Sequence, residues 1–222
     1  MTSPWPLAFA IAGALAVPLH PVATPVAAAV ACLLGILGLR LWRWSRLPEL
    51  MRRSRELWPW LPLWIVPGFA VGLLILAVLR LAIQPAVPAI FARIAAAGAL
   101  PVWRRLVIIY VAAVGEELVF RLILLSAVAG ITLRLRRVRA APTPAIAWAA
   151  NVVAALAFGA AHVPSWTGIG LTSPPLLAAV VGLNLVAGLV LGYVFATRGL
   201  AAAIWTHAGA DCTIQLAGPL LQ

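Results

Sequence analysis

Charge is what this 222-residue sequence has least of. Lysine is absent, acidic residues number 5, and charged residues make up only 9 % of the chain. A soluble domain carries about 25 % charged residues, so this composition excludes an ordinary soluble protein. The hydrophobic fraction of 64 % and the mean hydropathy of +1.08 predict an integral, multi-pass membrane protein instead.

Cysteine and alternating strand patterns are also scarce. Cys32 and Cys212 lie in different apolar runs without metal-ligand spacing, so we expect small buried hydrophobic side chains there. The apolar runs are continuous and rich in Ala and Leu, unlike the short alternating strands of a membrane barrel. The predicted fold class is all-α, a polytopic transmembrane bundle of about 7–8 helices, since each span needs roughly 20 apolar residues.

Proline and glycine, in places beside charge, separate the apolar runs. The runs cover 5–19, 22–42, 58–83, 86–101, 106–133, 144–171, 174–196 and 199–221. No basic segment precedes the first run, so we expect a retained span rather than a signal peptide. We predict a single membrane domain over 1–222, with N-terminal spans and a basic cytoplasmic loop in 1–57 and the core of the protein in 58–222.

All of the basic charge comes from arginine, and the net charge is +11. Arginines cluster at 40–55 and 134–139, and Arg198 lies between the last two runs. The positive-inside rule predicts that all three regions are cytoplasmic, facing anionic lipid headgroups. Nucleic-acid binding is not expected, because no nucleic-acid-binding motif accompanies the charge.

The short run 86–101 decides the topology. If it crossed the membrane, the arginine clusters at 40–55 and 134–139 would lie on opposite sides. We therefore interpret 86–101 as an interfacial or re-entrant helix. The alternative is eight full spans, with one basic loop on the outer side.

A few ionisable side chains interrupt the apolar runs. They are Glu116, Glu117, Arg121, His162, His207 and Asp211. A charged group costs about 2.5–3.5 kcal/mol or more at the centre of a membrane helix, so such groups face the protein interior or water and mark function. The set predicts one shared polar site inside the membrane. The remaining acids, Glu49 and Glu56, lie in the basic loop and are expected to be solvated.

Residue spacing supports a shared site. Glu117 and Arg121 are four residues apart, as are His207 and Asp211, and this spacing puts both members of a pair on one helix face. Glu116 lies about 100° round the helix from Glu117. The two adjacent carboxylates can therefore serve different neighbours.

Depth along the helices gives a partial check. At 1.5 Å per residue, Glu116 lies roughly 15 Å from the start of its run and His207 roughly 12 Å from the opposite face, near one level. His162 reaches that level only if its helix starts later than Pro144 and continues past Pro164. We therefore predict a kinked or shifted helix near 150–170.

Three short motifs, on three separate runs, carry a family resemblance. EELVFR at 116–121 fits E-E-x-x-x-R, FGAAH at 158–162 fits F-x-x-x-H, and HAGAD at 207–211 fits H-x-x-x-(N/D). The sequence resembles the CPBP family of intramembrane proteases, which includes type II CAAX prenyl endopeptidases and bacterial self-immunity relatives. The resemblance covers roughly 60–221 and makes 58–222 the expected protease core.

The resemblance implies a role for each matching residue. Glu116 would activate the attacking water, as a general base or as a metal ligand, and His162 would share that water or metal. Glu117 would support Glu116, with Arg121 holding the carboxylates through a charge-assisted bond. His207 would stabilise the oxyanion or complete a metal site.

The last motif position departs from the CAAX-processing branch, which has Asn where this chain has Asp211. An ionised Asp accepts hydrogen bonds but cannot donate one to an oxyanion. The substitution favours a role in orienting His207 or in binding a metal.

The residues alone leave two mechanisms open. Two histidines and one carboxylate (Glu116, His162 and His207) form a catalytic zinc ligand set with an open position for water. The same groups can act without metal, with a glutamate base and histidine donors. The resemblance implies an intramembrane endopeptidase with a polar catalytic cavity inside the membrane, and we expect it to hydrolyse a membrane-anchored or lipidated peptide or lipoprotein substrate in a bacterial inner membrane.

Two other functions remain as alternatives. The first is a non-catalytic membrane immunity or scaffolding protein that keeps the polar cluster for binding. The second is an ion-coupled transporter, which the lack of matching broken helices in two halves of the chain disfavours. Asn151 and Asn184 either form hydrogen bonds between helices or line the polar site, and we expect hydrogen bonds between helices.

Overall fold

The computed structural model describes residues 5–17, 21–47 and 58–221. Throughout these residues the regular structure is helical, without a strand. The predicted basic loop at 48–57, with Glu49 and Glu56, lies outside the described residues. The all-α fold class is confirmed.

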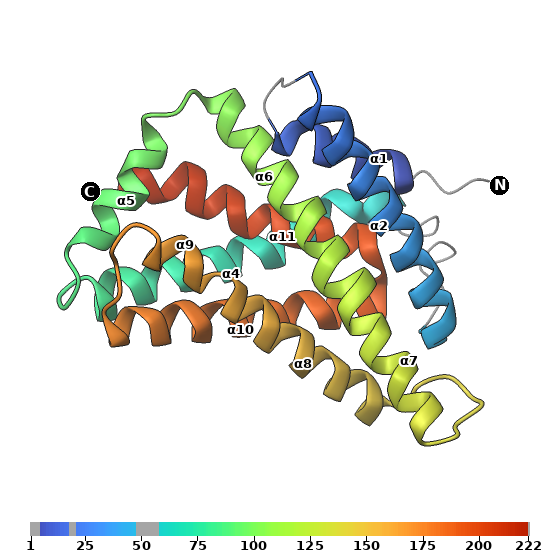
Figure 1. The fold of residues 1–222 in the computed structure, drawn as a ribbon. Helices are drawn as coiled ribbons and strands as arrows, with labels where there is room; N and C mark the ends of the chain where they lie inside the picture. The colour runs from blue at the N-terminus through green and yellow to red at the C-terminus, as the bar shows by residue number, and fades with distance from the viewer. Residues whose placement is uncertain (1–4, 18–20, 48–57, 222) are drawn as a thin grey trace.

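The helices follow one another with short connections (Figure 1). The first half contains α1 (Trp5–Ala16), α2 (Ala23–Ser45), η1 (Trp58–Trp64), α4 (Ile65–Val78), η2 (Leu79–Ile83), α5 (Ala89–Gly98) and α6 (Val102–Glu116). The second half contains η3 (Glu117–Leu125), α7 (Ser126–Leu135), α8 (Pro144–Ala161), α9 (Val163–Thr167), α10 (Pro174–Arg198), α11 (Leu200–Cys212), η4 (Thr213–Ala217) and η5 (Gly218–Leu220).

Several of these elements join end to end into longer membrane helices. Among the described residues, 5 helices are long and apolar enough to cross a membrane: Ala23–Ser45, Pro62–Ile83, Val102–Leu135, Pro144–Thr167 and Pro174–Arg198. Many large apolar side chains are exposed on them, as expected for surfaces that face lipid. The protein is an integral, multi-pass membrane protein.

α5 is too short to cross a membrane. Its 10 residues extend about 15 Å, against a hydrocarbon core of about 30 Å. Figure 1 shows α5 at the end of the molecule where η2 ends and α6 begins, and α6 to α7 then returns to the opposite end. This arrangement fits the interfacial or re-entrant interpretation of 86–101 and does not fit eight full spans.

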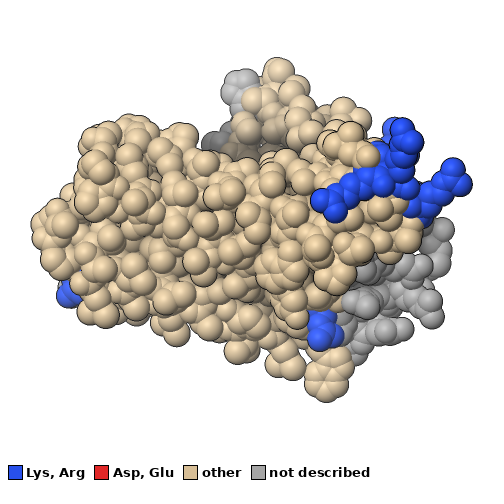
Figure 2. Space-filling view, turned by 90° about the horizontal axis from the view of Figure 1, so that it is seen from below, with Lys and Arg blue, Asp and Glu red and all other residues tan. Residues whose placement is uncertain are grey.

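The arginine-bearing ends of α2, α7 and α10 lie at the same end of the molecule (Figure 1). Arg134 near the end of α7 lies over the ring of Trp44 on α2, 5.2 Å from its centroid. Arg198 at the end of α10 lies 5.5 Å from the ring centroid of Trp64. Figure 2 shows most of the basic side chains in view at this end, with blue also at the opposite end, and no acidic side chain on the face in view. The predicted placement of the arginine clusters on one side agrees with this arrangement.

Glycines bring α4 and α11 into backbone contact. A Cβ on Gly68 would collide with the carbonyl oxygen of Thr206, and one on Gly72 would lie 2.7 Å from the carbonyl oxygen of Ala210. Thr206 Oγ1 also donates a hydrogen bond to the carbonyl of Trp64 at 2.9 Å. This small-residue packing, common between membrane helices, fixes the height and rotation of α11.

A second close contact joins α8 and α10. Gly188 and Gly192 face α8, where a Cβ on Gly188 would lie 2.9 Å from Cβ of Ala155. Asn151 Nδ2 donates to the carbonyl of Leu189 at 2.9 Å, which confirms the predicted bond between helices. The prediction for Asn184 is wrong, because its amide donates at 2.8 Å to Val180 within its own helix.

The long helix from 102 to 135 is not uniform. Its middle section, η3 at Glu117–Leu125, is a π-helix between α6 and α7. The four-residue spacing of Glu117 and Arg121 in the sequence predicts an ordinary α-helix here. π-helical segments occur frequently at functional sites.

Candidate active site

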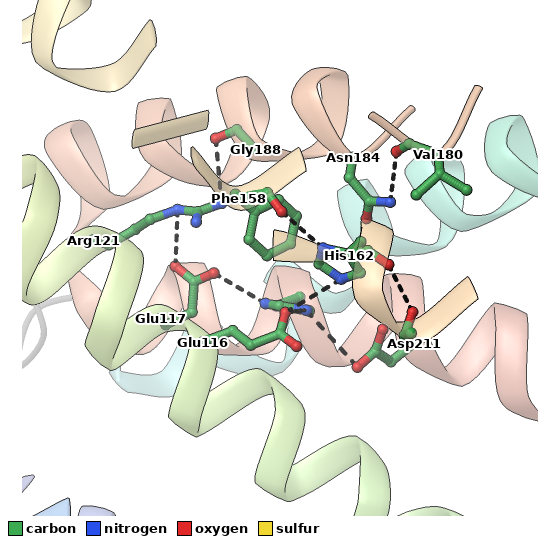
Figure 3. A network of polar contacts seen from close by, with 11 residues as sticks. Glu116, Glu117, Arg121, Phe158, His162, Val180, Asn184, Gly188 and Asp211 are labelled. Carbon is green, nitrogen blue, oxygen red and sulfur yellow. Dashed lines mark hydrogen bonds and ion pairs between the residues drawn. The ribbon is translucent and has the colours of Figure 1, made fainter. Parts of the chain in front are cut away.

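The six site residues predicted from the sequence lie in one network of contacts. Their side chains come from the end of α6, from η3, from the α8–α9 junction and from α11 (Figure 3). The contacting pairs are Glu116–His162, Glu116–His207, Glu117–His207, Glu117–Arg121 and His207–Asp211. Residues up to 95 positions apart in the chain are therefore brought together at one place.

Glu116 is at the centre of the accessible part of this network. Its Oε2 lies 3.8 Å from Nε2 of His162 and 3.5 Å from Nε2 of His207. The side chains of Glu116 and His162 are 32 % and 27 % exposed. A water molecule or a substrate can reach this pair from outside the protein.

Glu117 and Arg121 form the buried part. Both side chains are 0 % exposed, and Arg121 Nε lies 3.5 Å from Oε2 of Glu117. Arg121 Nη2 also donates to the carbonyl of Gly188 at 3.3 Å. A buried charge without a partner is strongly destabilising, so each of these two residues needs the other.

Glu117 fixes the second histidine as well. Its Oε1 lies 3.0 Å from Nδ1 of His207, and the carboxylate oxygen is the acceptor. His207 therefore donates through Nδ1 and turns Nε2 toward Glu116. One buried carboxylate contacts both the arginine and the histidine.

His162 is oriented by the end of a helix. Its backbone N–H bonds to the carbonyl of Gly159 at 3.3 Å, where a continuing α-helix would use the carbonyl of Phe158. That free carbonyl accepts from Nδ1 of His162 at 2.8 Å, leaving Nε2 to face Glu116. The interruption predicted near 150–170 is confirmed at this residue.

The predicted later start of this helix is wrong. α8 begins at Pro144, because Thr143 caps it by accepting a hydrogen bond from the backbone of Ile146 and proline suits the first helical position. After the junction at His162 the chain is helical again to Thr167, past Pro164, as predicted.

Phe158 forms an apolar wall for the site. The guanidinium carbon of Arg121 lies 4.7 Å from its ring centroid. The rings of His162 and His207 meet it edge-on, with centroids 4.7 Å and 5.8 Å away. Phe158 begins the F-x-x-x-H motif, but no role was predicted for its side chain.

Asp211 lies on the accessible side of His207. Its Oδ2 is 3.8 Å from Nε2 of His207, and its side chain is 22 % exposed. Glu117 contacts His207 more closely, at Nδ1, and the role favoured for Asp211 from the sequence, orienting His207 or binding a metal, stays a prediction. Asp211 contacts the same imidazole nitrogen as Glu116 does.

The comparison with protein families fits this geometry. The model of the type II CAAX prenyl endopeptidase Rce1-like family matches residues 97–213, more than half of the chain. The chain belongs to this family. All six site residues lie inside the matched region. The comparisons with curated proteins and with solved structures found no match.

Membership places the protein in a family of endopeptidases and agrees with the recognition made from three motifs. The matched region begins in α5 and ends at the start of η4. Helix α4, which packs against α11, lies before the matched region, and so do α1 and α2.

The donor atoms of the site bear on the predicted zinc ion. Among the described residues, no group of three or more His, Cys, Asp or Glu side chains is arranged so that it could hold a metal ion. The expected set of Glu116, His162 and His207 does not meet that requirement as it stands. Zinc at this site stays a prediction.

Proposed function

We propose that the protein is an intramembrane endopeptidase in which Glu116 activates water to attack a peptide bond. The observation that carries this proposal is the position of Glu116 Oε2, which faces Nε2 of both His162 and His207 while the side chain stays 32 % exposed. Family membership supports protease chemistry at this place.

In the first step, Glu116 accepts a proton from water, and the resulting hydroxide forms a bond to the carbonyl carbon of the substrate. The carbonyl oxygen becomes an oxyanion. His162 and His207 both donate through Nδ1, so a histidine stabilises this oxyanion in its imidazolium form, which carries a second proton on Nε2 and donates a hydrogen bond from it. His162 and His207 both turn Nε2 toward this space.

In the second step, the proton held by Glu116 passes to the substrate nitrogen, and the C–N bond breaks. The products are a new carboxyl group and a new amine, so the proton and the water are fully accounted for. Glu117 and Arg121 take no part in bond exchange. They hold His207 in the orientation that both steps use.

The proposed substrate is a membrane-anchored or lipidated peptide. The site lies on helices that belong to apolar membrane spans, including Val102–Leu135 and Pro144–Thr167, so a substrate held in the same membrane can reach it. The family description, a CAAX prenyl endopeptidase, favours a lipidated segment.

Anionic lipid headgroups are the proposed partner of the exposed arginines near the end of α7: Arg134, Arg136, Arg137 and Arg139. Basic segments beside a membrane helix are attracted to anionic lipid surfaces. This placement agrees with the proposed location in the inner membrane of a bacterium, with the basic end in the cytoplasm.

Cleavage of prenylated and unprenylated membrane peptides by the purified protein in detergent tests the proposal. Glu116→Ala and His162→Ala should each reduce kcat by about 10²–10⁴-fold, the usual contribution of a general base. Val119→Ala is the matched control, because Val119 is close in sequence and its side chain is exposed. Unchanged cleavage in both site variants would refute the assignment. A cellular phenotype that survives Glu116→Gln would favour the non-catalytic alternative.

A further inference from the structure

α9 is a short helix that has little stability of its own and lies next to the candidate active site. It directly follows His162, has 5 residues, and contains no buried residue. So short a helix is not stable in isolation. Its position therefore depends on the elements that contact it, and that position sets the backbone of His162.

An arginine from a distant segment contacts this helical turn. Arg93 on α5 donates from Nη1 to the carbonyl of Ser165 at 2.6 Å, across 72 residues of sequence. The guanidinium carbon of Arg93 also lies 4.5 Å from the ring centroid of Trp166. None of the ion pairs found among the described residues includes Arg93. Its polar and cation–π contacts are therefore both made with α9.

The residue that Arg93 contacts is itself bonded to the site. Ser165 Oγ donates to the carbonyl of His162 at 2.7 Å. On the other side, Nδ1 of His162 donates to the carbonyl of Phe158. A continuous series of hydrogen bonds thus leads from α5 through Ser165 to His162, and on to the end of α8.

Small movements at His162 have large consequences. Its Nε2 is already 3.8 Å from Oε2 of Glu116, beyond hydrogen-bonding distance. A misplacement of about 1 Å can reduce the rate about 10²-fold. The contact between α5 and α9 therefore acts on the distance that the proposed mechanism uses.

We infer that Arg93 is a positioning residue for His162. It anchors α9 to α5, and through Ser165 it holds the histidine with Nε2 toward Glu116. The catalytic consequence rests on the proposed function, whereas the mechanical link between Arg93 and α9 does not. The inference also assigns a role to α5, the short helix that does not cross the membrane.

Hydrogen exchange tests the mechanical link without any activity assay. Arg93→Ala should raise the amide exchange of 163–171 by about tenfold, because local opening becomes easier, and leave that of 144–158 unchanged. Arg104→Ala is the matched control, since Arg104 also lies near a tryptophan ring, that of Trp103 at 5.9 Å, on α6. Unchanged exchange at 163–171 in the Arg93 variant would overturn the inference.

Kinetics test the positioning role. Arg93→Ala should lower kcat about tenfold with KM within about twofold, because misplacement affects the chemical step more than binding. Arg93→Lys should restore part of kcat, since an ammonium group can still donate to Ser165 although it cannot present a planar guanidinium to Trp166. The midpoint of thermal unfolding should be the same in both Arg93 variants as in the wild-type protein.

The remaining outcomes of these two experiments would each contradict either the positioning role or the proposed function. A raised KM with unchanged kcat would assign Arg93 to substrate binding and overturn the positioning role. Raised amide exchange at 163–171 with unchanged kcat and KM would also overturn the positioning role. A wild-type protein that cleaves no peptide would count against the proposed function, while the exchange experiment would still decide whether Arg93 anchors α9.

Discussion

The six polar residues of the site fall into two groups of three that differ in exposure. The shielded group is Glu117, Arg121 and His207, with side-chain exposures of 0 %, 0 % and 5 %. The accessible group is Glu116, His162 and Asp211, with exposures of 32 %, 27 % and 22 %. The shielded group is tightly interlinked, whereas the accessible group surrounds the space where Nε2 of both histidines points.

The two adjacent glutamates show what this difference means. Glu116 ends α6 and Glu117 begins the π-helix η3, so consecutive carboxylates point into different surroundings. The buried carboxylate is held by an ion pair and a histidine, and the accessible one faces both histidines at Nε2. In the proposed function, Glu117 supports the structure of the site and Glu116 carries the chemistry.

Removing the buried arginine should have the largest effect on stability. Arg121→Ala leaves the carboxylate of Glu117 buried without its cation, and breaking such a pair costs about 3–5 kcal/mol. Thermal or denaturant unfolding in detergent measures this loss. Arg136→Ala, at an exposed position, is the control and should change stability by less than about 0.5 kcal/mol. Equal stability of the two variants would contradict the division of the site.

Changing Asp211, an acid of the accessible group, should affect stability much less. Asp211→Asn keeps the size of the side chain, and the amide can donate a hydrogen bond to an oxyanion where the carboxylate cannot. We expect stability within about 0.5 kcal/mol of wild type and kcat/KM within about tenfold, a change of about 1.4 kcal/mol. Peptide cleavage and unfolding measured on the same preparation check both values. A loss of stability as large as that of Arg121→Ala would place Asp211 in the shielded group.

The six site residues could be predicted because ionisable groups stand out in apolar runs. Glu117–Arg121 and His207–Asp211 were also readable as pairs from their four-residue spacing, and both pairs are in contact in the structure. Their catalytic roles remain proposals. The arginine distribution alone predicted that the run 86–101 is interfacial or re-entrant. With 10 residues, α5 is short enough for that interpretation.

Other features depend on distances that no local pattern contains. The π-helix η3, the carbonyl of Phe158 that is freed for His162, and the contact of Arg93 with α9 all arise from tertiary packing. The close approach of α4 and α11 did have a signal, because Gly68 and Gly72 are four residues apart. Such spacing is a known helix-packing motif in membranes.

The most direct test of the account compares Glu116→Gln with Glu117→Gln, measuring peptide cleavage and thermal stability for both. The account predicts that Glu116→Gln lowers kcat by about 10²–10⁴-fold with an unchanged midpoint. It predicts that Glu117→Gln destabilises the protein by about 3–5 kcal/mol, because Arg121 loses its buried partner. A stable, inactive Glu117→Gln together with an active Glu116→Gln would contradict it.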